Sequence, residues 1–330
     1  MAGLSLLTAC GDDEPNKGQP IQVKPESERT ILVMDTRGNL YNTDGEVVLS
    51  ANQTLVSPSQ IIPFAQDYYM AGTTVSSAGI GYWKNGSWTR VADAPQGYLG
   101  TAGISKLFDD IYLLVNCESG VRVYKNGTPI QLTTSNGDGG LEITASGSHV
   151  YVCGSSSGTG SAEALMWTDG ERHVLPTSSG TQRAVGYCVY ANGTHTLVGG
   201  NMDNTPVVWI DKALYKLPLA DGFSAGEVCD VAEQGGKVYS VGHRVTQGGL
   251  KQATVWIEGQ ARSYATSNSG TVWSDALGLQ FYSQDFYVLT VDYDDTDGDG
   301  ANRKITSHVW LNGQRKCSLP GVSAAGFVVI

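Results

Sequence analysis

A short motif recurs seven times along the chain, and this repeat restricts the fold more than any other feature. Each copy has an aromatic residue followed by a tight polar stretch, most often ending in Asn-Gly or Asp-Gly. The aromatics are spaced 42, 41, 43, 42, 47 and 54 residues apart. The seven copies begin at Tyr41, Trp83, Tyr124, Trp167, Trp209, Trp256 and Trp310. Two copies depart from the pattern: the first has one extra residue, and the fifth has Lys212 in place of glycine.

The motif predicts a β-hairpin in every repeat. Asn-Gly and Asp-Gly between apolar runs favour type I′ turns, because both central residues of such a turn need a positive φ. Another apolar run precedes each hairpin, as at 68–72 and 150–154, and a weaker one precedes that, as at 141–145 and 227–232. Four short strands per repeat are typical of a propeller blade. The chain is therefore predicted to be all-β, a seven-bladed β-propeller with four antiparallel strands per blade.

The two ends of the repeat region predict how the ring closes. Residues 29–50 supply only three strands of a blade, whereas residues 324–330 form an apolar run without a blade of its own. We expect this C-terminal strand to complete the first blade as its innermost strand, which removes an exposed sheet edge. The propeller is thus predicted to span residues 29–330.

The N-terminal segment carries an export motif. Leu7-Thr8-Ala9-Cys10 resembles the lipobox of bacterial lipoproteins, in which a signal peptidase cuts before the cysteine and the cysteine is then acylated. The resemblance implies a signal peptide at 1–9 and lipidation of Cys10, followed by a flexible acidic tether through residue 28. Residues 1–9 contain no Lys or Arg, so we expect the signal peptide to be truncated at its start.

The tether also indicates a cellular location. An acidic run directly after the lipidated cysteine resembles the surface-export signal of some Gram-negative lipoproteins. The expected location is the outer membrane with the protein exposed at the cell surface; a periplasm-facing protein is the alternative. The repeats themselves, such as the Trp-Lys-Asn-Gly sequence at 83–86, resemble those of largely uncharacterised bacterial secreted lipoprotein propellers. That resemblance covers residues 29–330 and implies the fold, but it brings no catalytic motif.

The predicted function is that of a non-catalytic binding or interaction module. Long loops, at 154–163, 242–252 and 292–304, are expected on one face around the channel mouth, where a glycan, peptide or protein ligand would bind. A formal net charge of −11 argues against a nucleic-acid partner. The repeated aromatics are expected to pack between blades. Trp88 and Trp273 fall outside the repeat and are better candidates for stacking on a ligand.

A polysaccharide-directed hydrolase or lyase is the alternative function. Two carboxyl groups that face each other across a channel mouth could act as acid and base. The candidates lie on predicted innermost strands and are Glu142, Glu227, Asp230 and Asp275. Acids gathered with an Arg, Lys or His at the mouth would favour this alternative over simple binding.

One loop is a candidate calcium site. Asp295, Asp297 and Asp299, followed by Gly300, match the first half of a D-x-D-x-D-G calcium loop, in which alternate carboxylates converge on one cation. The twelfth position is Thr306 instead of the usual Glu. Calcium is therefore expected to bind weakly.

The remaining cysteines and histidines show no metal-binding spacing. Apart from Cys10 there are five cysteines, an odd number that gives no disulfide framework. Cys188 and Cys229 are expected on innermost strands of adjacent blades, and whether they pair is left open. The histidines are expected at the surface or at strand ends; they are His149, His173, His195, His243 and His308.

Overall fold

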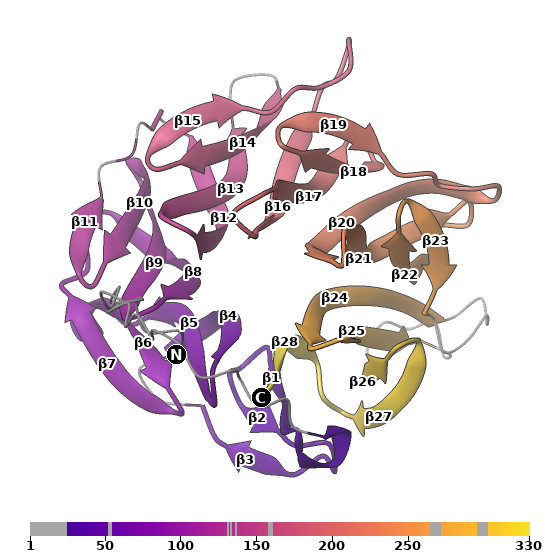
Figure 1. The fold of residues 1–330 in the computed structure, drawn as a ribbon, viewed down its shortest axis with the longest axis horizontal. Helices are drawn as coiled ribbons and strands as arrows, with labels where there is room; N and C mark the ends of the chain where they lie inside the picture. The colour runs from indigo at the N-terminus through magenta and orange to yellow at the C-terminus, as the bar shows by residue number, and fades with distance from the viewer. Residues whose placement is uncertain are drawn as a thin grey trace, which may run out of the picture.

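The computed structural model describes residues 25–51, 55–130, 132, 134–135, 137–157, 161–264, 272–295 and 303–330. Within them the chain forms seven four-stranded antiparallel sheets, which stand as blades around a central channel (Figure 1). The predicted seven-bladed propeller is confirmed. The lipobox and Cys10 lie outside the described residues. No helix in the described part of the chain is long and apolar enough to cross a membrane.

Blades 1 to 4 contain β1 to β15 together with β28, and in each blade the strands follow one another from the channel outwards. Blade 1 consists of β28 (Ala324–Val329), β1 (Ile31–Asp35), β2 (Leu40–Tyr41) and β3 (Val47–Leu49). Blade 2 consists of β4 (Leu55–Phe64), β5 (Asp67–Thr74), β6 (Ile80–Lys84) and β7 (Ser87–Ala92). Blade 3 consists of β8 (Tyr98–Leu107), β9 (Asp110–Cys117), β10 (Gly120–Lys125) and β11 (Thr128–Ile130). Blade 4 consists of β12 (Asp138–Ser146), β13 (His149–Ser157), β14 (Ala162–Thr168) and β15 (Glu171–Val174).

Blades 5 to 7 complete the ring in chain order. Blade 5 consists of β16 (Ala184–Ala191), β17 (Thr196–Met202), β18 (Thr205–Ile210) and β19 (Ala213–Lys216). Blade 6 consists of β20 (Phe223–Gln234), β21 (Lys237–Thr246), β22 (Lys251–Ile257) and β23 (Gln260–Ser263). Blade 7 consists of β24 (Val272–Tyr282), β25 (Asp285–Asp294), β26 (Lys304–Leu311) and β27 (Gln314–Pro320). Two short 3-10 helices are η1 (Glu26–Glu28) and η2 (Ser76–Ala78).

The C-terminal strand closes the first blade, as predicted. β28 pairs antiparallel with β1, and Thr30 and Ile330 exchange two backbone hydrogen bonds of 2.8 and 2.9 Å beyond the ends of the two strands. The Gln280 side chain of blade 7 then holds β28 from its other side. Its amide nitrogen donates to the Val329 carbonyl at 2.8 Å, and its amide oxygen accepts from the Val329 N–H at 2.9 Å.

The residue before the glycine of the repeated turn also makes a side-chain hydrogen bond to the neighbouring strand. In six blades the residue before the repeat glycine, or before Lys212, has a left-handed φ between 47° and 51°. Its side-chain oxygen accepts the N–H of the first or second residue of the second strand, as Asn85 does from Tyr68 at 3.0 Å and Asn126 from Ile111 at 2.9 Å. Equivalent bonds are made by Asp169, Asp211, Glu258 and Asn312. The motif therefore joins a turn to the strand beside it.

The repeated aromatics form the interface between blades, as predicted. The indole rings of Trp83, Trp167, Trp209 and Trp256 are all at most 1% exposed. Trp209, for example, lies in one apolar cluster with Met166 and Val189 of blades 4 and 5. Trp88 packs on Trp83 with ring centroids 4.4 Å apart, so its ring contributes to the same kind of core.

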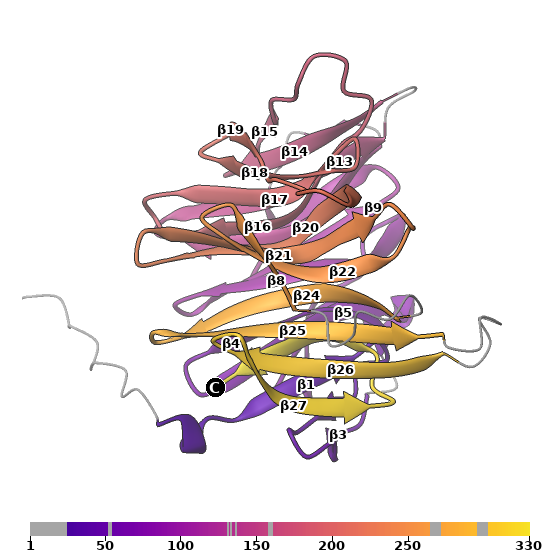
Figure 2. The same ribbon diagram turned by 90° about the vertical axis from the view of Figure 1, so that its right-hand side faces the viewer.

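The ring has two faces that carry different parts of the chain (Figure 2). The terminal face, towards the viewer in Figure 1, carries Ile330, Arg29 and the turns between first and second strands, such as 235–236. The loop face, opposite, carries the connections between blades and those between second and third strands, such as 247–250. Arg29 fixes the N-terminal segment to blade 7 through Asp285 at 2.6 Å and the Tyr287 hydroxyl at 2.8 Å.

Lys212 has a strained backbone conformation in the turn of the fifth repeat, and replacing it with glycine should stabilise the protein. Its φ is +69°, where the other turns have glycine, and its side chain is exposed. A left-handed backbone costs a residue with a Cβ about 1–2 kcal/mol. We expect Lys212→Gly to raise the free energy of unfolding by about 1 kcal/mol, or about 2 °C in melting temperature for a domain of this size.

The matched control is Gly259→Lys. Gly259 has φ +74°, and a Cβ added there would meet no atom within 4 Å, so only the backbone would be strained. This change should lower the melting temperature by a similar amount. Equal melting curves for all three proteins would contradict the explanation.

Candidate functional site

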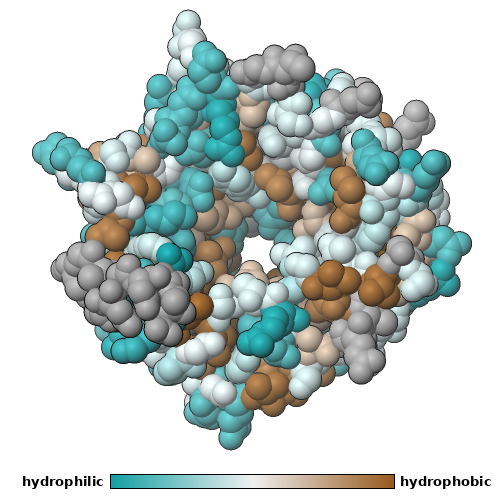
Figure 3. Space-filling view, turned by 180° about the vertical axis from the view of Figure 1, so that it is seen from behind, coloured by the Kyte–Doolittle hydropathy of each residue, from teal (hydrophilic) through white to brown (hydrophobic). Residues whose placement is uncertain are grey.

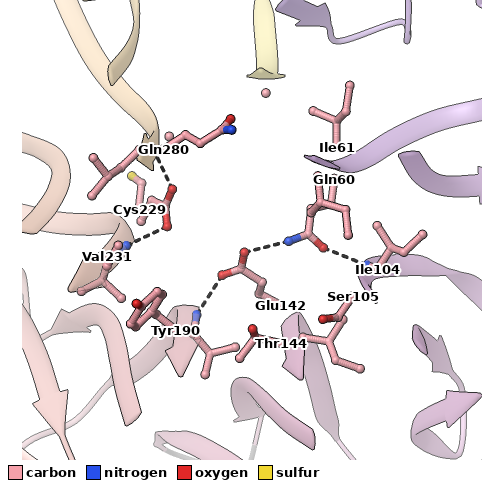
Figure 4. Close-up of a pocket in the computed structure, with 18 of the residues that line it drawn as sticks. Gln60, Ile61, Ile104, Ser105, Glu142, Thr144, Tyr190, Cys229, Val231 and Gln280 are labelled. Carbon is pink, nitrogen blue, oxygen red and sulfur yellow. Dashed lines mark hydrogen bonds between the residues drawn. The ribbon is translucent and has the colours of Figure 1, made fainter. Parts of the chain in front are cut away.

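The innermost strands enclose a channel that is wide enough for a small ligand. A cavity of about 610 Å³ is lined by residues of all seven innermost strands (Figure 4). A second cavity of about 430 Å³ lies next to it on the loop face and shares Ser59 and Ala102 with it. The channel mouth is open at the centre of the loop face in Figure 3. Both volumes lie in the range of ligand pockets.

A register shift in each innermost strand decides which side chains reach across the channel wall. One residue in each blade directly follows this shift. From blade to blade around most of the ring, that residue alternates between a small and a larger side chain. In blade order from 1 to 7 these residues are Gly326, Gln60, Gly103, Glu142, Cys188, Asp230 and Gly278. The small residues leave space for their neighbours: a Cβ on Gly103 would lie 3.0 Å from the Gln60 amide oxygen.

Each of the larger side chains fastens its own blade to the next one. Gln60 Oε1 accepts the N–H of Ile104 at 2.8 Å, and Glu142 Oε2 accepts that of Val189 at 2.8 Å. In the same way Ser105 accepts from Ala145 at 2.9 Å and Asp230 from Leu279 at 2.7 Å. Figure 4 shows several of these bonds around the channel wall. Two of the predicted catalytic acids, Glu142 and Asp230, therefore hold innermost strands together.

Glu142 and Asp230 also form a coupled pair of carboxyl groups. Burial raises the pKa of Asp230 to about 7. Burial, and after it the negative charge of Asp230, raise the pKa of Glu142 well above its usual value. Each of the four carboxyl oxygens accepts a hydrogen bond, from Gln60, Val189, Val231 and Leu279. The pair therefore binds a proton more readily than exposed carboxyl groups do, but its oxygens are already engaged by the protein.

The other two predicted acids lie elsewhere, between blades 6 and 7. Glu227 stands opposite His243 in the register of β20 and β21, and its Oε1 is 3.8 Å from His243 Nδ1. Asp275 reaches across from β24 to within 2.7 Å of the same nitrogen, and Lys251 Nζ lies 3.4 Å from Asp275 Oδ1. The sequence prediction that the histidines lie at the surface or at strand ends is wrong for His243 and His308, which are each 4% exposed, inside β21 and β26.

The place of His243 holds different residues in different blades, among them Thr73 in blade 2, Ser155 in blade 4 and Val291 in blade 7. Asn116 in blade 3 and Asn201 in blade 5 occupy the place of His243. In each of these blades the residue directly follows the partner of the last innermost-strand residue before the register shift. Asn116 bonds both backbone groups of Gly140 at 2.9 Å, and Asn201 donates to the Gly226 carbonyl at 2.7 Å. His243 instead meets the Asp275 carboxylate.

The sequence contained a usable signal for His243. In blades 4, 5 and 6 the residue in question follows the last glycine of the second-strand run, at Ser155, Asn201 and His243. Aligning the repeats on that glycine would have shown a histidine where another blade has an amide.

Cys188 and Cys229 are both free thiols, so the disulfide left open by the sequence does not form in this structure. Burial, followed by the charge of Glu227, raises the pKa of the Cys229 thiol well above its usual value, and the positive charge of Lys251 offsets only part of this rise. Because the thiolate is the reactive form, Cys229 is a poor nucleophile at neutral pH.

The calcium loop falls largely outside the described residues, which exclude Asp297 and Asp299. Asp295 is described, and its Oδ2 lies 3.6 Å from Arg303 Nε. The Arg303 guanidinium also lies over the Trp273 ring, 4.5 Å from its centroid. Calcium binding at Asp295, Asp297 and Asp299 stays a prediction.

The loop-face cavity is polar but almost uncharged. Its lining includes the hydroxyl groups of Ser57, Ser59 and Thr73, the amide of Asn116 and two glycines. The one acid among its described lining residues, Asp138, is neutralised by Arg172 through bonds of 2.9 and 3.0 Å. Leu99, 61% exposed, adds an apolar surface to the lining.

No protein-family model and no curated protein matches the chain. Among solved structures it is similar to the computationally designed protein Ika8, with 14% identity, a TM-score of 0.48, and coverage of 90% of this chain and 89% of that one. A putative TolB from Agrobacterium tumefaciens has 10% identity and a TM-score of 0.44, with coverage of 91% and 96%.

A third similar structure is the extracellular domain of a putative one-component system from B. thetaiotaomicron. It has 10% identity and a TM-score of 0.41, and the match covers 86% of this chain and 51% of that one. These likenesses are too distant to transfer a function, which must be inferred from the residues of this chain.

The carboxyl pair predicts a pH-dependent stability. The folded-state pKa of Asp230 is about 7, above its ordinary value of 3.8, so the folded chain binds more protons than the unfolded chain between these values. The free energy of unfolding should therefore fall as the pH rises through this window, by on the order of 1–3 kcal/mol. Glu142→Gln removes one of the two coupled charges, so its melting temperature should fall less between about pH 5 and pH 8.

The control is Glu171→Gln, which changes an exposed glutamate on an outer strand. Its pH profile should follow that of the parent. A Glu142→Gln profile that also follows the parent would show that the pair does not carry a buried charge.

Proposed function

We propose that the protein is a non-catalytic binding module that takes an uncharged, hydroxyl-rich ligand, a short glycan, in the loop-face cavity. The lining of that cavity carries the proposal: Ser57, Ser59 and Thr73 offer hydroxyl groups that can both donate and accept. Its volume of about 430 Å³ suits one or two sugar rings. Because Asp138 is neutralised by Arg172, the lining favours a neutral ligand over a cation.

The position of the acids supports binding over hydrolysis. The cavity is built by blades 2, 3 and 4, whereas Glu227, His243 and Asp275 belong to blades 6 and 7. Glu142 and Asp230 are engaged with the backbone of the channel wall. A glycan in the loop-face cavity would therefore contact none of the four acids that hydrolysis would need.

The proposal includes an anchor at the cell envelope. Pro25 to Thr30 lead to the terminal face, where Thr30 pairs with Ile330. If the chain is held through a lipid on Cys10, the tether joins the propeller at the terminal face. The loop face, with the cavity, is then the face farther from the point of attachment.

The anchor is tested by Cys10→Ala in a full-length precursor. Acylation adds about 0.8 kcal/mol of membrane affinity per buried methylene, so its loss should release the protein into the soluble fraction. Cys317→Ala, which changes a propeller thiol, is the control and should stay membrane-bound. A Cys10→Ala protein that fractionates with membranes like the parent would disprove the anchor.

Glycan binding is tested by screening the parent on an array of neutral and anionic glycans and titrating the best ligand by calorimetry. Ser59→Trp places a large ring on an exposed position that both cavities share, and should weaken binding at least about tenfold, or 1.4 kcal/mol. Ser87→Trp, on the exposed outer strand of the same blade, should leave binding unchanged.

The array has two outcomes that would refute the proposal. One is binding confined to anionic glycans. The other is a complete lack of glycan binding by a folded parent.

A further inference from the structure

The cluster between blades 6 and 7 gathers several different metal-ligand atoms in one place. Ligand atoms of Glu227, Cys229 and His243 all lie within 4.8 Å of one another. Asp275 adds a carboxylate oxygen 2.7 Å from His243 Nδ1. These residues come from three strands, β20, β21 and β24, of two blades. Their convergence depends on the register shift between Val228 and Asp230, with Cys229 as the extra residue.

The His243 side chain is buried, and its Nδ1 atom makes no hydrogen bond of good geometry to a described residue. Its side chain is 5% exposed. Its Nδ1 lies 2.7 Å from Asp275 Oδ1, yet neither atom has a hydrogen bond of acceptable angle to any described residue. A buried polar group left in this state requires an explanation.

We propose that Glu227, Cys229 and His243 form a transition-metal site, with Zn²⁺ as the ion that their donors suit best, and that Asp275 positions His243 beside it. One sulfur, one nitrogen and one oxygen donor form a mixed set that zinc accepts, at about 2.0–2.3 Å from each atom. Calcium and magnesium prefer oxygen donors alone. The ion would deprotonate the Cys229 thiol on binding.

The charges around the cluster balance with such an ion. Two carboxylates and one thiolate carry three negative charges, and Zn²⁺ leaves one of them uncompensated. Lys251 Nζ, 3.4 Å from Asp275 Oδ1, supplies the remaining positive charge. Three protein ligands leave the fourth position of a tetrahedral ion open to water or to another ligand.

A second cluster in the channel does not meet the same conditions. Glu142, Cys188 and Asp230 also have ligand atoms within 4.8 Å of one another. This set has no imidazole, and its four carboxyl oxygens already accept hydrogen bonds. The two clusters therefore differ in whether their donors are free to bind an ion.

The experiment uses the full chain, freed of metal by a chelator and titrated with Zn²⁺ and with Co²⁺ as a spectroscopic probe. We expect saturation at one equivalent, a thiolate-to-cobalt charge-transfer band, and a higher melting temperature with Zn²⁺. Cys229→Ser should abolish the band. His243→Asn should weaken Zn²⁺ binding by at least about 100-fold, the upper limit of the effect of an outer-shell partner.

The variants are chosen so that folding and binding can be separated. Asparagine already occupies the place of His243 in blades 3 and 5, so His243→Asn should fold. His195→Asn removes a histidine that pairs with Glu233 at 2.8 Å on the terminal face, and Cys317→Ser removes a thiol of blade 7. Both controls should bind like the parent. No saturable binding by the parent, equal binding by His243→Asn, or a band that survives Cys229→Ser would each overturn the site.

Discussion

The innermost strand of every blade has one edge without a strand partner, and the rest of the structure depends on how its backbone groups are satisfied. A buried N–H without an acceptor is costly, and closing the ring brings seven such edges together. Side chains from the neighbouring blade supply acceptors at Ile104, Ala145, Val189 and Leu279, and Gln280 supplies both partners for Val329. Contacts between blades are thus made by polar groups at the axis and by tryptophan rings farther out.

This arrangement changes the meaning of acidic residues in a propeller channel. Glu142 and Asp230 line the cavity, yet their carboxyl groups are engaged in joining blades. Glu227 and Asp275 instead meet a histidine and a lysine. The seven blades can be compared with one another. A side chain that makes the same inter-blade hydrogen bond as its counterparts in other blades is structural, and a side chain that makes a different contact is a candidate for function.

The sequence predicted the fold because its signals are local. The period near 42 residues, the Asn-Gly turns and the unmatched strand at 324–330 each depend on residues close together in the chain. The grouping of the acids could not be predicted in this way. Asp275 reaches the same histidine as Glu227, His243, only through the packing of two blades. The register shifts beside Glu142 and Asp230 also change the side that each strand presents. One extra residue in a strand has no signature in a pattern of hydrophobic residues.

The number of blades places a limit on the pattern around the axis. Small and larger side chains alternate after the register shifts, so that each larger group lies against a small neighbour. A ring with an even number of units could alternate without interruption, but in an odd ring two like units must be neighbours somewhere. In this ring Gly278 and Gly326 are those neighbours, in blades 7 and 1. The two neighbouring glycines therefore lie at the junction at which the two ends of the propeller meet. There Gln280, two positions farther along β24 than Gly278, makes the hydrogen bonds to the next blade instead, with both backbone groups of Val329.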